Sequence, residues 1–195
     1  NIVHPEQDVE RVLYTKEQIA ARVAELGKQL TEDYLGKRPV VVCILTGASV
    51  FYVDLCREIA TDLEMDFIIA SSYGASTTSS GVIRLIKDLE TDITDRHVLL
   101  VEDIIDSGKT LSYLARYLKL KGVRSVRTCT MLDKPARRTA QIKADYVGFV
   151  CADEFVVGYG LEVALVTYVG QNWGAGNLGR IKMGTRAATA MGLVT

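Results

Sequence analysis

The residues best suited to do chemistry lie between positions 98 and 111. An apolar run is followed by the carboxylates Glu102 and Asp103 and then by a polar turn that reads Asp106-Ser107-Gly108-Lys109-Thr110. Apolar residues at helical spacing come next, so the turn is predicted to lie between the end of a strand and the start of a helix. Unpaired backbone N–H groups at a helix N-terminus bind anions, hydroxyl side chains add donors, and glycine lets the backbone approach a ligand closely. The turn therefore predicts a phosphate site.

A nucleotide-binding loop of the form Gly-x-x-x-x-Gly-Lys-Thr is the nearest competing motif. That loop requires a glycine five positions before Gly108, where this chain has Asp103. Three carboxylates beside a phosphate site would repel a phosphorylated ligand unless a divalent cation or a hydroxyl-rich sugar lay between them. The residues therefore predict a ligand that carries phosphate, hydroxyl groups and magnesium.

Strands and helices alternate along the chain and would position this turn. A capping box, Thr15-Lys16-Glu17-Gln18, begins the first helix, and further helical segments are expected at about 50–60 and after Gly108. Short apolar runs predict strands at 40–45, 67–70, 98–101, 126–132 and 146–150. This order predicts an α/β fold, with a central, mostly parallel sheet flanked by helices on both faces.

Polar residues follow the ends of three of these strands. They are Thr46-Gly47, Glu102-Asp103 and Lys134. Ligands of parallel sheets bind at the carboxyl ends of the strands, so these residues are expected at one edge of the sheet.

Length, net charge, cysteine content and the absence of long apolar runs limit which classes of protein and partner are expected. A chain of 195 residues fits one domain, and a net charge of -1 argues against a nucleic-acid partner held by general electrostatics. Its four cysteines show no paired spacing and are expected to be buried and reduced. No signal peptide and no apolar run of about 18 residues is apparent, so we expect a cytoplasmic protein without a membrane partner.

Several segments in order resemble the type I phosphoribosyltransferases, and in particular their hypoxanthine-guanine branch. Besides 98–111 they are Ile-Leu-Thr-Gly-Ala at 44–48, Ser-Ser-Tyr-Gly at 71–74 with 77–81, Leu-Asp-Lys-Pro at 132–135 and Phe-Val-Val-Gly-Tyr-Gly-Leu at 155–161. The resemblance implies a single domain over 1–195, with a core at about 35–150 and a small hood formed by about 1–15 and 151–195.

The same resemblance implies the reaction. The 5-phosphoribosyl group of 5-phosphoribosyl-1-pyrophosphate would pass to hypoxanthine or guanine, giving IMP or GMP and pyrophosphate, with Mg²⁺ as cofactor. A homo-oligomer, either a dimer or a tetramer, is also implied.

Individual roles follow from the matching positions. Asp106 would be the general base near N7 of the purine. Without the resemblance, its position would indicate only a turn residue or a helix cap. Lys134 would donate to the purine 6-oxygen, although a lone lysine after a strand is normally solvated. Ribose hydroxyls or magnesium would be bound by Glu102, Asp103 and Glu162. Arg138 would lie near the pyrophosphate. The remaining substrate contacts implied are Thr46, Gly47, Ser72, Tyr73, Ile105, Ser107, Gly108, Lys109, Thr110, Phe155 and Val156.

Three of those assignments have a further basis. Ser72 and Tyr73 belong to a polar stretch, 71–81, which by itself is equally compatible with an ordinary surface loop. The resemblance implies that it is a lid that excludes water from the reacting centre. Phe155 matches an aromatic residue stacked on the purine, although a phenylalanine beside two valines would otherwise read as core.

The chain departs from the family pattern at Thr46 and again from residue 162 onward. Thr46 stands where a lysine is usual, which removes a positive charge, and Glu162 stands where an aspartate is usual. After Leu161 the family's Asp-Tyr pair and arginine are missing, and the tail to Thr195 matches no pattern. Two alternatives stay open: a non-catalytic regulator that senses phosphoribosyl pyrophosphate, and a transferase for another base such as xanthine or orotate.

Overall fold

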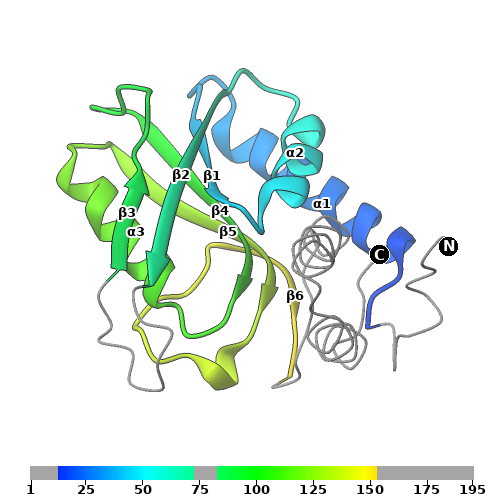
Figure 1. The fold of residues 1–195 in the computed structure, drawn as a ribbon. Helices are drawn as coiled ribbons and strands as arrows, with labels where there is room; N and C mark the ends of the chain where they lie inside the picture. Colours follow the sequence, from blue (N-terminus) through cyan, green and yellow to red (C-terminus); the bar gives the residue numbers. More distant parts are fainter. Residues whose placement is uncertain (1–12, 73–82, 153–195) are drawn as a thin grey trace, which may run out of the picture.

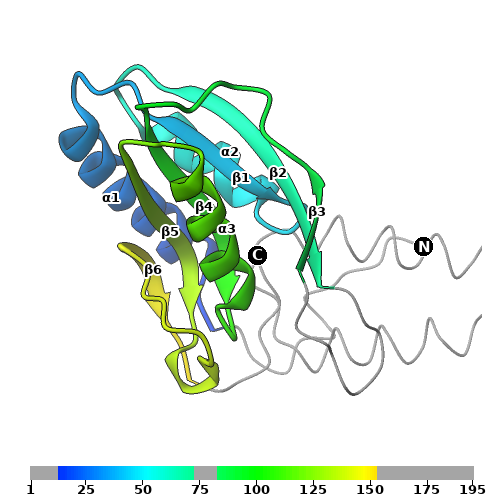
Figure 2. The same ribbon diagram turned by 90° about the vertical axis from the view of Figure 1, so that its left-hand side faces the viewer.

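The computed structural model describes residues 13–72 and 83–152, which form a six-stranded sheet with helices on both faces (Figure 1). The elements in chain order are α1 (Lys16–Tyr34), β1 (Val40–Leu45), α2 (Ser49–Glu58), β2 (Glu64–Ser72), β3 (Ile83–Lys87), β4 (His97–Ile105), α3 (Lys109–Leu120), β5 (Ser125–Asp133), the 3₁₀ turn η2 (Pro135–Arg137) and β6 (Tyr146–Val150). The sheet order is β3-β2-β1-β4-β5-β6, with β3 and β6 at the two edges (Figure 2). All neighbouring pairs are parallel except β2 and β3, which confirms the predicted mostly parallel sheet.

The capping box at the start of α1 is present as predicted. The Thr15 hydroxyl accepts from the N–H of Gln18 at 3.3 Å, and the Gln18 side chain accepts from the N–H of Thr15 at 2.8 Å. Two backbone donors of the first turn are thereby satisfied, which stabilises the helix N-terminus.

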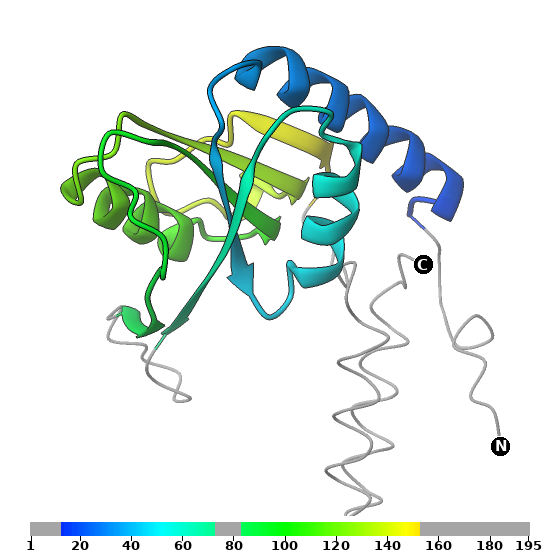
Figure 3. The ribbon, with the colours of Figure 1, turned by 90° about the horizontal axis from the view of Figure 1, so that it is seen from above.

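Apolar side chains form one core on each face of the sheet. Helices α1 and α2 cover one face and α3 covers the other (Figure 3). Strand β1 contributes to both because successive side chains of a strand point to opposite faces: Val41 lies in the core beneath α1 and α2, and Val42 in the core beneath α3. The burial of β1 on both faces explains why its sequence is continuously apolar.

The structure differs from the predicted elements in three places. Strand β3 was not predicted; it is an edge strand whose side chains alternate between half-buried and exposed. Ser71 and Ser72, expected in a loop, extend β2. Glu102 and Asp103, expected after a strand end, lie within β4, because pairing with β5 continues to Ile105 opposite Asp133.

The four cysteines are free thiols, as predicted, with Cys43 and Cys129 buried and Cys56 and Cys151 partly buried. Burial is the main cause that raises the pKa of Cys43 to about 12 and that of Cys56 to about 11. Among the described helices, none has both the length and the apolar character needed to cross a bilayer. Most of the expected hood, at about 1–15 and 151–195, lies outside the described residues, so that division stays a prediction.

Candidate functional site

The polar residues predicted at one edge of the sheet do lie there. Thr46 and Gly47 follow β1 directly, and the adjacent strand β4 carries Asp103 beside Gly47. A Cβ atom built at Gly47 would lie 2.7 Å from Oδ2 of Asp103. The turn after β1 therefore touches a carboxylate of β4, and glycine at 47 makes this approach possible.

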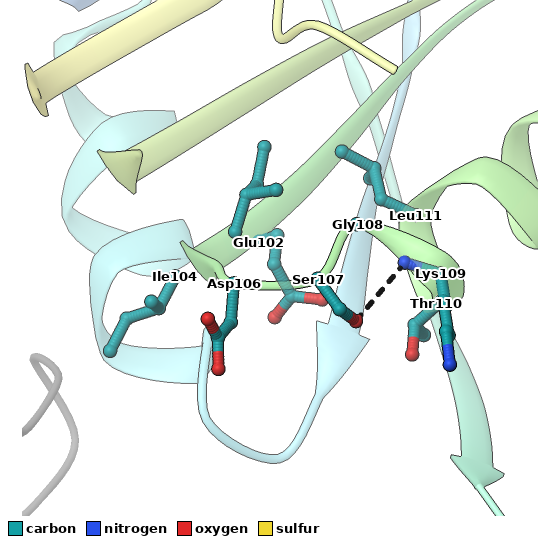
Figure 4. A pocket seen from close by; sticks show the side chains of 9 residues that line it. Glu102, Ile104, Asp106, Ser107, Gly108, Lys109, Thr110 and Leu111 are labelled. Carbon is teal, nitrogen blue, oxygen red and sulfur yellow. Dashed lines mark hydrogen bonds between the residues drawn. The ribbon is translucent and has the colours of Figure 1, made fainter. Parts of the chain in front are cut away.

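The turn after β4 forms a pocket of about 120 Å³ at the N-terminus of α3 (Figure 4). In Figure 4 the carboxylate of Asp106 and the hydroxyls of Ser107 and Thr110 point to the same side of the turn. The residues that line the pocket are Glu102 and Ile104 to Leu111.

Backbone N–H groups at the start of α3 are available to a ligand. Gly108 is the N-cap residue of α3, and no side chain caps this helix end. The N–H of Lys109 has only a long contact, 3.4 Å, with the hydroxyl oxygen of Ser107. Uncapped N–H groups at the positive end of a helix dipole favour a bound anion, which agrees with the predicted phosphate site.

Gly108 meets two separate requirements. Its φ of 76° lies in the left-handed region, which residues with a Cβ rarely adopt. A Cβ there would also lie 2.7 Å from Cδ of Arg138 and 2.8 Å from Cγ2 of Ile142. The turn is therefore packed closely against the segment that follows β5.

The carboxylates of the site differ in their surroundings. Burial is the largest cause that raises the pKa of Glu102 well above its ordinary value, and the charge of neighbouring Asp103 raises it further. The Asp103 carboxylate accepts a hydrogen bond from the N–H of Ile104 at 2.8 Å. Asp106 is exposed, and its Oδ1 lies 3.5 Å from Nε of Arg137.

Burial and the neighbouring charge of Asp103 both disfavour the ionised form of Glu102. A divalent cation bound beside these two adjacent carboxylates would stabilise that ionised form, so the pair suits such a cation. Within residues 13–72 and 83–152, no three His, Cys, Asp or Glu side chains come together as a complete metal cage. Glu102, Asp103 and Asp106 thus do not form one three-carboxylate cluster. Any Mg²⁺ held here would need oxygen ligands from water or from the substrate.

Lys134 and Arg138 lie on the segment after β5, as their place in the sequence predicts. Lys134 is only 4% exposed, and its N–H donates to the carbonyl of Ile105 at 3.0 Å. Arg138 forms an ion pair with Asp133 and donates to the carbonyl of Asp106 at 3.2 Å. Arg138 thus directly contacts the backbone of residues 105–110, the turn predicted to bind phosphate, which is called the phosphate turn below.

Asp133 was not singled out from the sequence. It is the last residue of β5 and is 7% exposed. The available signal was a charged residue that ends an apolar strand and immediately precedes Lys134, since a buried carboxylate requires a partner.

Five predicted substrate contacts remain, and of these Ser72 is the last residue of β2. The others lie outside the described residues: Tyr73, Phe155, Val156 and Glu162.

Comparison with known proteins points to one family. The family model described as "Phosphoribosyl transferase domain" matches residues 12–164. The hypoxanthine-guanine phosphoribosyltransferase of Bacillus subtilis is 50% identical over 157 residues, which cover 80% of this chain and 87% of that protein. The bifunctional protein TilS/HprT of Listeria monocytogenes is also 50% identical over 157 residues. In that case the match spans only about a quarter, 24%, of the longer protein.

Solved structures agree in fold as well as in sequence. The crystal structure of a hypoxanthine phosphoribosyltransferase from Staphylococcus aureus matches with a TM-score of 0.78 and 46% identity. The match covers 82% of this chain and 87% of that one. The likeness includes β4, the phosphate turn and the start of α3, all of which fall within the family match at 12–164.

Proposed function

Because this chain belongs to the phosphoribosyl transferase domain family, we propose that it is a hypoxanthine-guanine phosphoribosyltransferase of purine salvage. It transfers the 5-phosphoribosyl group of 5-phosphoribosyl-1-pyrophosphate to hypoxanthine or guanine, and the products are IMP or GMP and pyrophosphate. The observation that carries the proposal is the pair Glu102-Asp103 on β4, which leads directly into the turn at the uncapped N-terminus of α3. A phosphorylated sugar requires both features within a few residues of each other.

The phosphate turn binds the 5-phosphate in this proposal. The N–H groups at the start of α3 and the hydroxyls of Ser107 and Thr110 donate to the phosphate oxygens, while Ile105, Gly108 and Lys109 complete the turn. Glu102 and Asp103 accept from the ribose hydroxyls. Their negative charge also stabilises the positive charge that develops on the ribose ring as the bond to pyrophosphate breaks.

Glu102 and Asp103 would also hold Mg²⁺ through their oxygens, with Glu162 as a third candidate. When bound, Mg²⁺ supplies charge neutralisation for the departing pyrophosphate. Thr46 and Gly47, of which Gly47 lies against Asp103, would contact the pyrophosphate through their backbone. Thr46 would do so without the charge that a lysine supplies.

A second group of residues contacts the purine in this proposal. Asp106, which is exposed at the mouth of the turn, accepts a proton from the incoming purine as general base in this proposal. Lys134 donates to the 6-oxygen of the purine, Phe155 stacks on its ring, and the backbone of Val156 meets its edge. Ser72 and Tyr73 belong to the segment that closes over the reacting centre and excludes water.

The protein is further proposed to form a dimer or tetramer, which size-exclusion chromatography with light scattering would measure. Four free thiols are compatible with a reducing compartment such as the cytoplasm.

An assay with Mg²⁺, 5-phosphoribosyl-1-pyrophosphate and separate bases tests the function. We expect IMP from hypoxanthine and GMP from guanine, each with release of pyrophosphate. Orotate or xanthine as the preferred base would support the transferase for another base. Binding of 5-phosphoribosyl-1-pyrophosphate without turnover of any base would instead support a sensor without catalysis.

A further inference from the structure

Three successive carbonyls of the phosphate turn accept hydrogen bonds from one segment, 134–140. The carbonyl of Ile105 accepts from the N–H of Lys134 at 3.0 Å, and that of Asp106 accepts from Nε of Arg138 at 3.2 Å. The carbonyl of Ser107 accepts from the N–H groups of Thr139 and Ala140, both at 3.0 Å. The negative ends of three peptide dipoles are thus directed toward this segment.

This arrangement matters for an anion site. A carbonyl oxygen near a bound phosphate would repel it, whereas an N–H group attracts it. Because each peptide unit is planar, fixing its carbonyl also fixes the opposite direction of the N–H in that unit. The segment after β5 therefore orients the backbone of the phosphate turn from behind the pocket.

Arg138 is the centre of these contacts. Besides Asp106, it donates to the carbonyl of Ile142 at 2.7 Å and, through a longer contact of 3.4 Å, to that of Ile105. Its side chain also runs against the Cα of Gly108, where a Cβ would lie 2.7 Å from Cδ. Among the described residues, those that line the pocket include neither Arg138 nor Asp133.

Asp133 fixes Arg138 in place. The two side chains form an ion pair and are only 10% and 14% exposed, with Asp133 the less exposed. A guanidinium has five donors in a rigid fork, so one carboxylate and several carbonyls satisfy it together. Removing the carboxylate would leave a largely buried cation without its counter-charge, which is strongly unfavourable.

We propose that Asp133 and Arg138 are positioning residues for phosphate binding: their ion pair holds the carbonyls of 105–107 away from the pocket, and Arg138 acts through this backbone rather than by contacting pyrophosphate. The proposal rests on the proposed function, because it assigns the turn to the 5-phosphate of the substrate. It also links the turn to Lys134, which lies between Asp133 and η2 in the same segment.

The variant Asp133→Asn distinguishes this proposal from a purely electrostatic effect of the Asp133 charge, because the two predict opposite changes in phosphate affinity. Removing a negative charge near an anion site should tighten phosphate binding if charge alone mattered. Loss of the clamp should weaken it. IMP is the appropriate probe, since it carries the 5-phosphate and no pyrophosphate.

The experiment measures IMP binding by calorimetry and steady-state kinetics for wild type, Asp133→Asn and Arg138→Lys. For both variants we expect the Kd for IMP and the KM for 5-phosphoribosyl-1-pyrophosphate to rise by about 10- to 100-fold, the size of effect that misplacement of a binding group produces. The kcat at saturating substrate should change much less. Asp33→Asn is the matched control: it removes the ion pair of Arg127, 3.0 Å long, near the start of the same strand β5, and should leave both constants unchanged.

Two results would overturn the proposal. One is IMP affinity in Asp133→Asn that equals or exceeds wild type. The other is an Arg138→Lys variant that loses affinity for 5-phosphoribosyl-1-pyrophosphate but keeps it for IMP, which would place Arg138 on the pyrophosphate. If Asp133→Asn does not fold, Arg138→Lys decides, because lysine retains the charge but lacks the fork that reaches several carbonyls.

Amide hydrogen exchange on the ligand-free proteins tests the clamp independently of the substrate. The N–H groups of Lys134, Thr139 and Ala140 should exchange faster in Asp133→Asn than in wild type or Asp33→Asn. Unchanged exchange would contradict the clamp. If wild type binds neither IMP nor 5-phosphoribosyl-1-pyrophosphate, the proposed function fails, and this exchange measurement still decides whether the ion pair holds the turn.

Discussion

Gly47 lies so close to Asp103 that a Cβ atom at position 47 would be 2.7 Å from the carboxylate oxygen Oδ2. The contact joins the turn after β1 to the carboxylate pair of β4. The other oxygen of this carboxylate, Oδ1, accepts from the N–H of Ile104 at 2.8 Å, so a displacement of the Asp103 side chain would disturb that hydrogen bond. The space that glycine leaves is thus part of the geometry of the site.

Gly47→Ala should therefore displace the Asp103 carboxylate and lower kcat/KM for 5-phosphoribosyl-1-pyrophosphate by about 10-fold or more, as small displacements of binding groups do. The free energy of unfolding should change by less than about 1 kcal/mol, since the collision is with a side chain that can yield. Steady-state kinetics and urea unfolding measure the two quantities. A fully active variant would show that the position of Asp103 is not critical.

Asp106→Asn should lower kcat by about 10²- to 10⁴-fold, the usual effect of losing a general base. Asparagine has the same shape but cannot accept the proton. Binding of 5-phosphoribosyl-1-pyrophosphate should persist because Asp106 is exposed at the mouth of the turn. Turnover near that of wild type would exclude Asp106 as the base.

Gly108→Ala should weaken binding of 5-phosphoribosyl-1-pyrophosphate far more than binding of the free base. The substitution combines backbone strain at φ 76° with contacts of 2.7 and 2.8 Å to Arg138 and Ile142. Gly36→Ala is the matched control, since Gly36 also has a positive φ, 70°, but nothing lies within 4 Å of its added Cβ.

Both glycine variants should lose about 1 kcal/mol of unfolding free energy through strain. Only Gly108→Ala should lose substrate affinity, measured by calorimetry for each ligand separately. Equal losses for 5-phosphoribosyl-1-pyrophosphate and base would point to a general disturbance of the fold.

The enzyme should use hypoxanthine and reject adenine. The Lys134 ammonium can only donate, so it pairs with a 6-oxygen but leaves a 6-amino group opposite a donor. A site that hydrogen-bonds one substrate group rejects an analogue without it by about 10⁴- to 10⁵-fold. Lys134→Ala should reduce this ratio of kcat/KM values, whereas Lys119→Ala, an exposed lysine near the end of α3, should preserve it. An unchanged ratio in Lys134→Ala would remove Lys134 from base recognition.

Asp66 should make the stability of the protein depend on pH in the acid range. Burial acts to raise the pKa of Asp66, but several hydrogen bonds outweigh this effect, and the net pKa lies below its ordinary value of 3.8. Its carboxylate oxygens accept from the backbone N–H groups of Phe67, Glu90 and Thr91 at 2.6, 2.9 and 2.8 Å. Since the folded-state pKa is lowered, this stabilisation is present above about pH 3.8 and is lost as the pH falls through the folded-state pKa.

Asp66→Asn should accordingly cost about 1–3 kcal/mol of unfolding free energy at pH 7, and the difference from wild type should shrink below pH 3.8. Urea unfolding at a series of pH values measures it, with exposed Asp62→Asn as the control. A constant difference across the whole pH range would contradict the lowered pKa.

The sequence by itself determined the alternation of strands and helices, because local signals carry that information. The capping box at Thr15 and the continuous apolar run of β1 are each readable within a few residues, and both are confirmed. It also determined the composition of the phosphate turn, since the motif Asp106-Ser107-Gly108-Lys109-Thr110 is contiguous along the chain. Family membership follows from the same contiguous motifs.

Only the tertiary structure decided where β4 ends and what lies behind the phosphate turn. Glu102 and Asp103 belong to the strand because the neighbouring β5 supplies hydrogen bonds that no local pattern encodes. The ion pair of Asp133 with Arg138 and the contact of Gly47 with Asp103 depend on which segments the sheet order brings together. Such contacts between separate elements are set by packing, and spacing in a single sequence does not contain them.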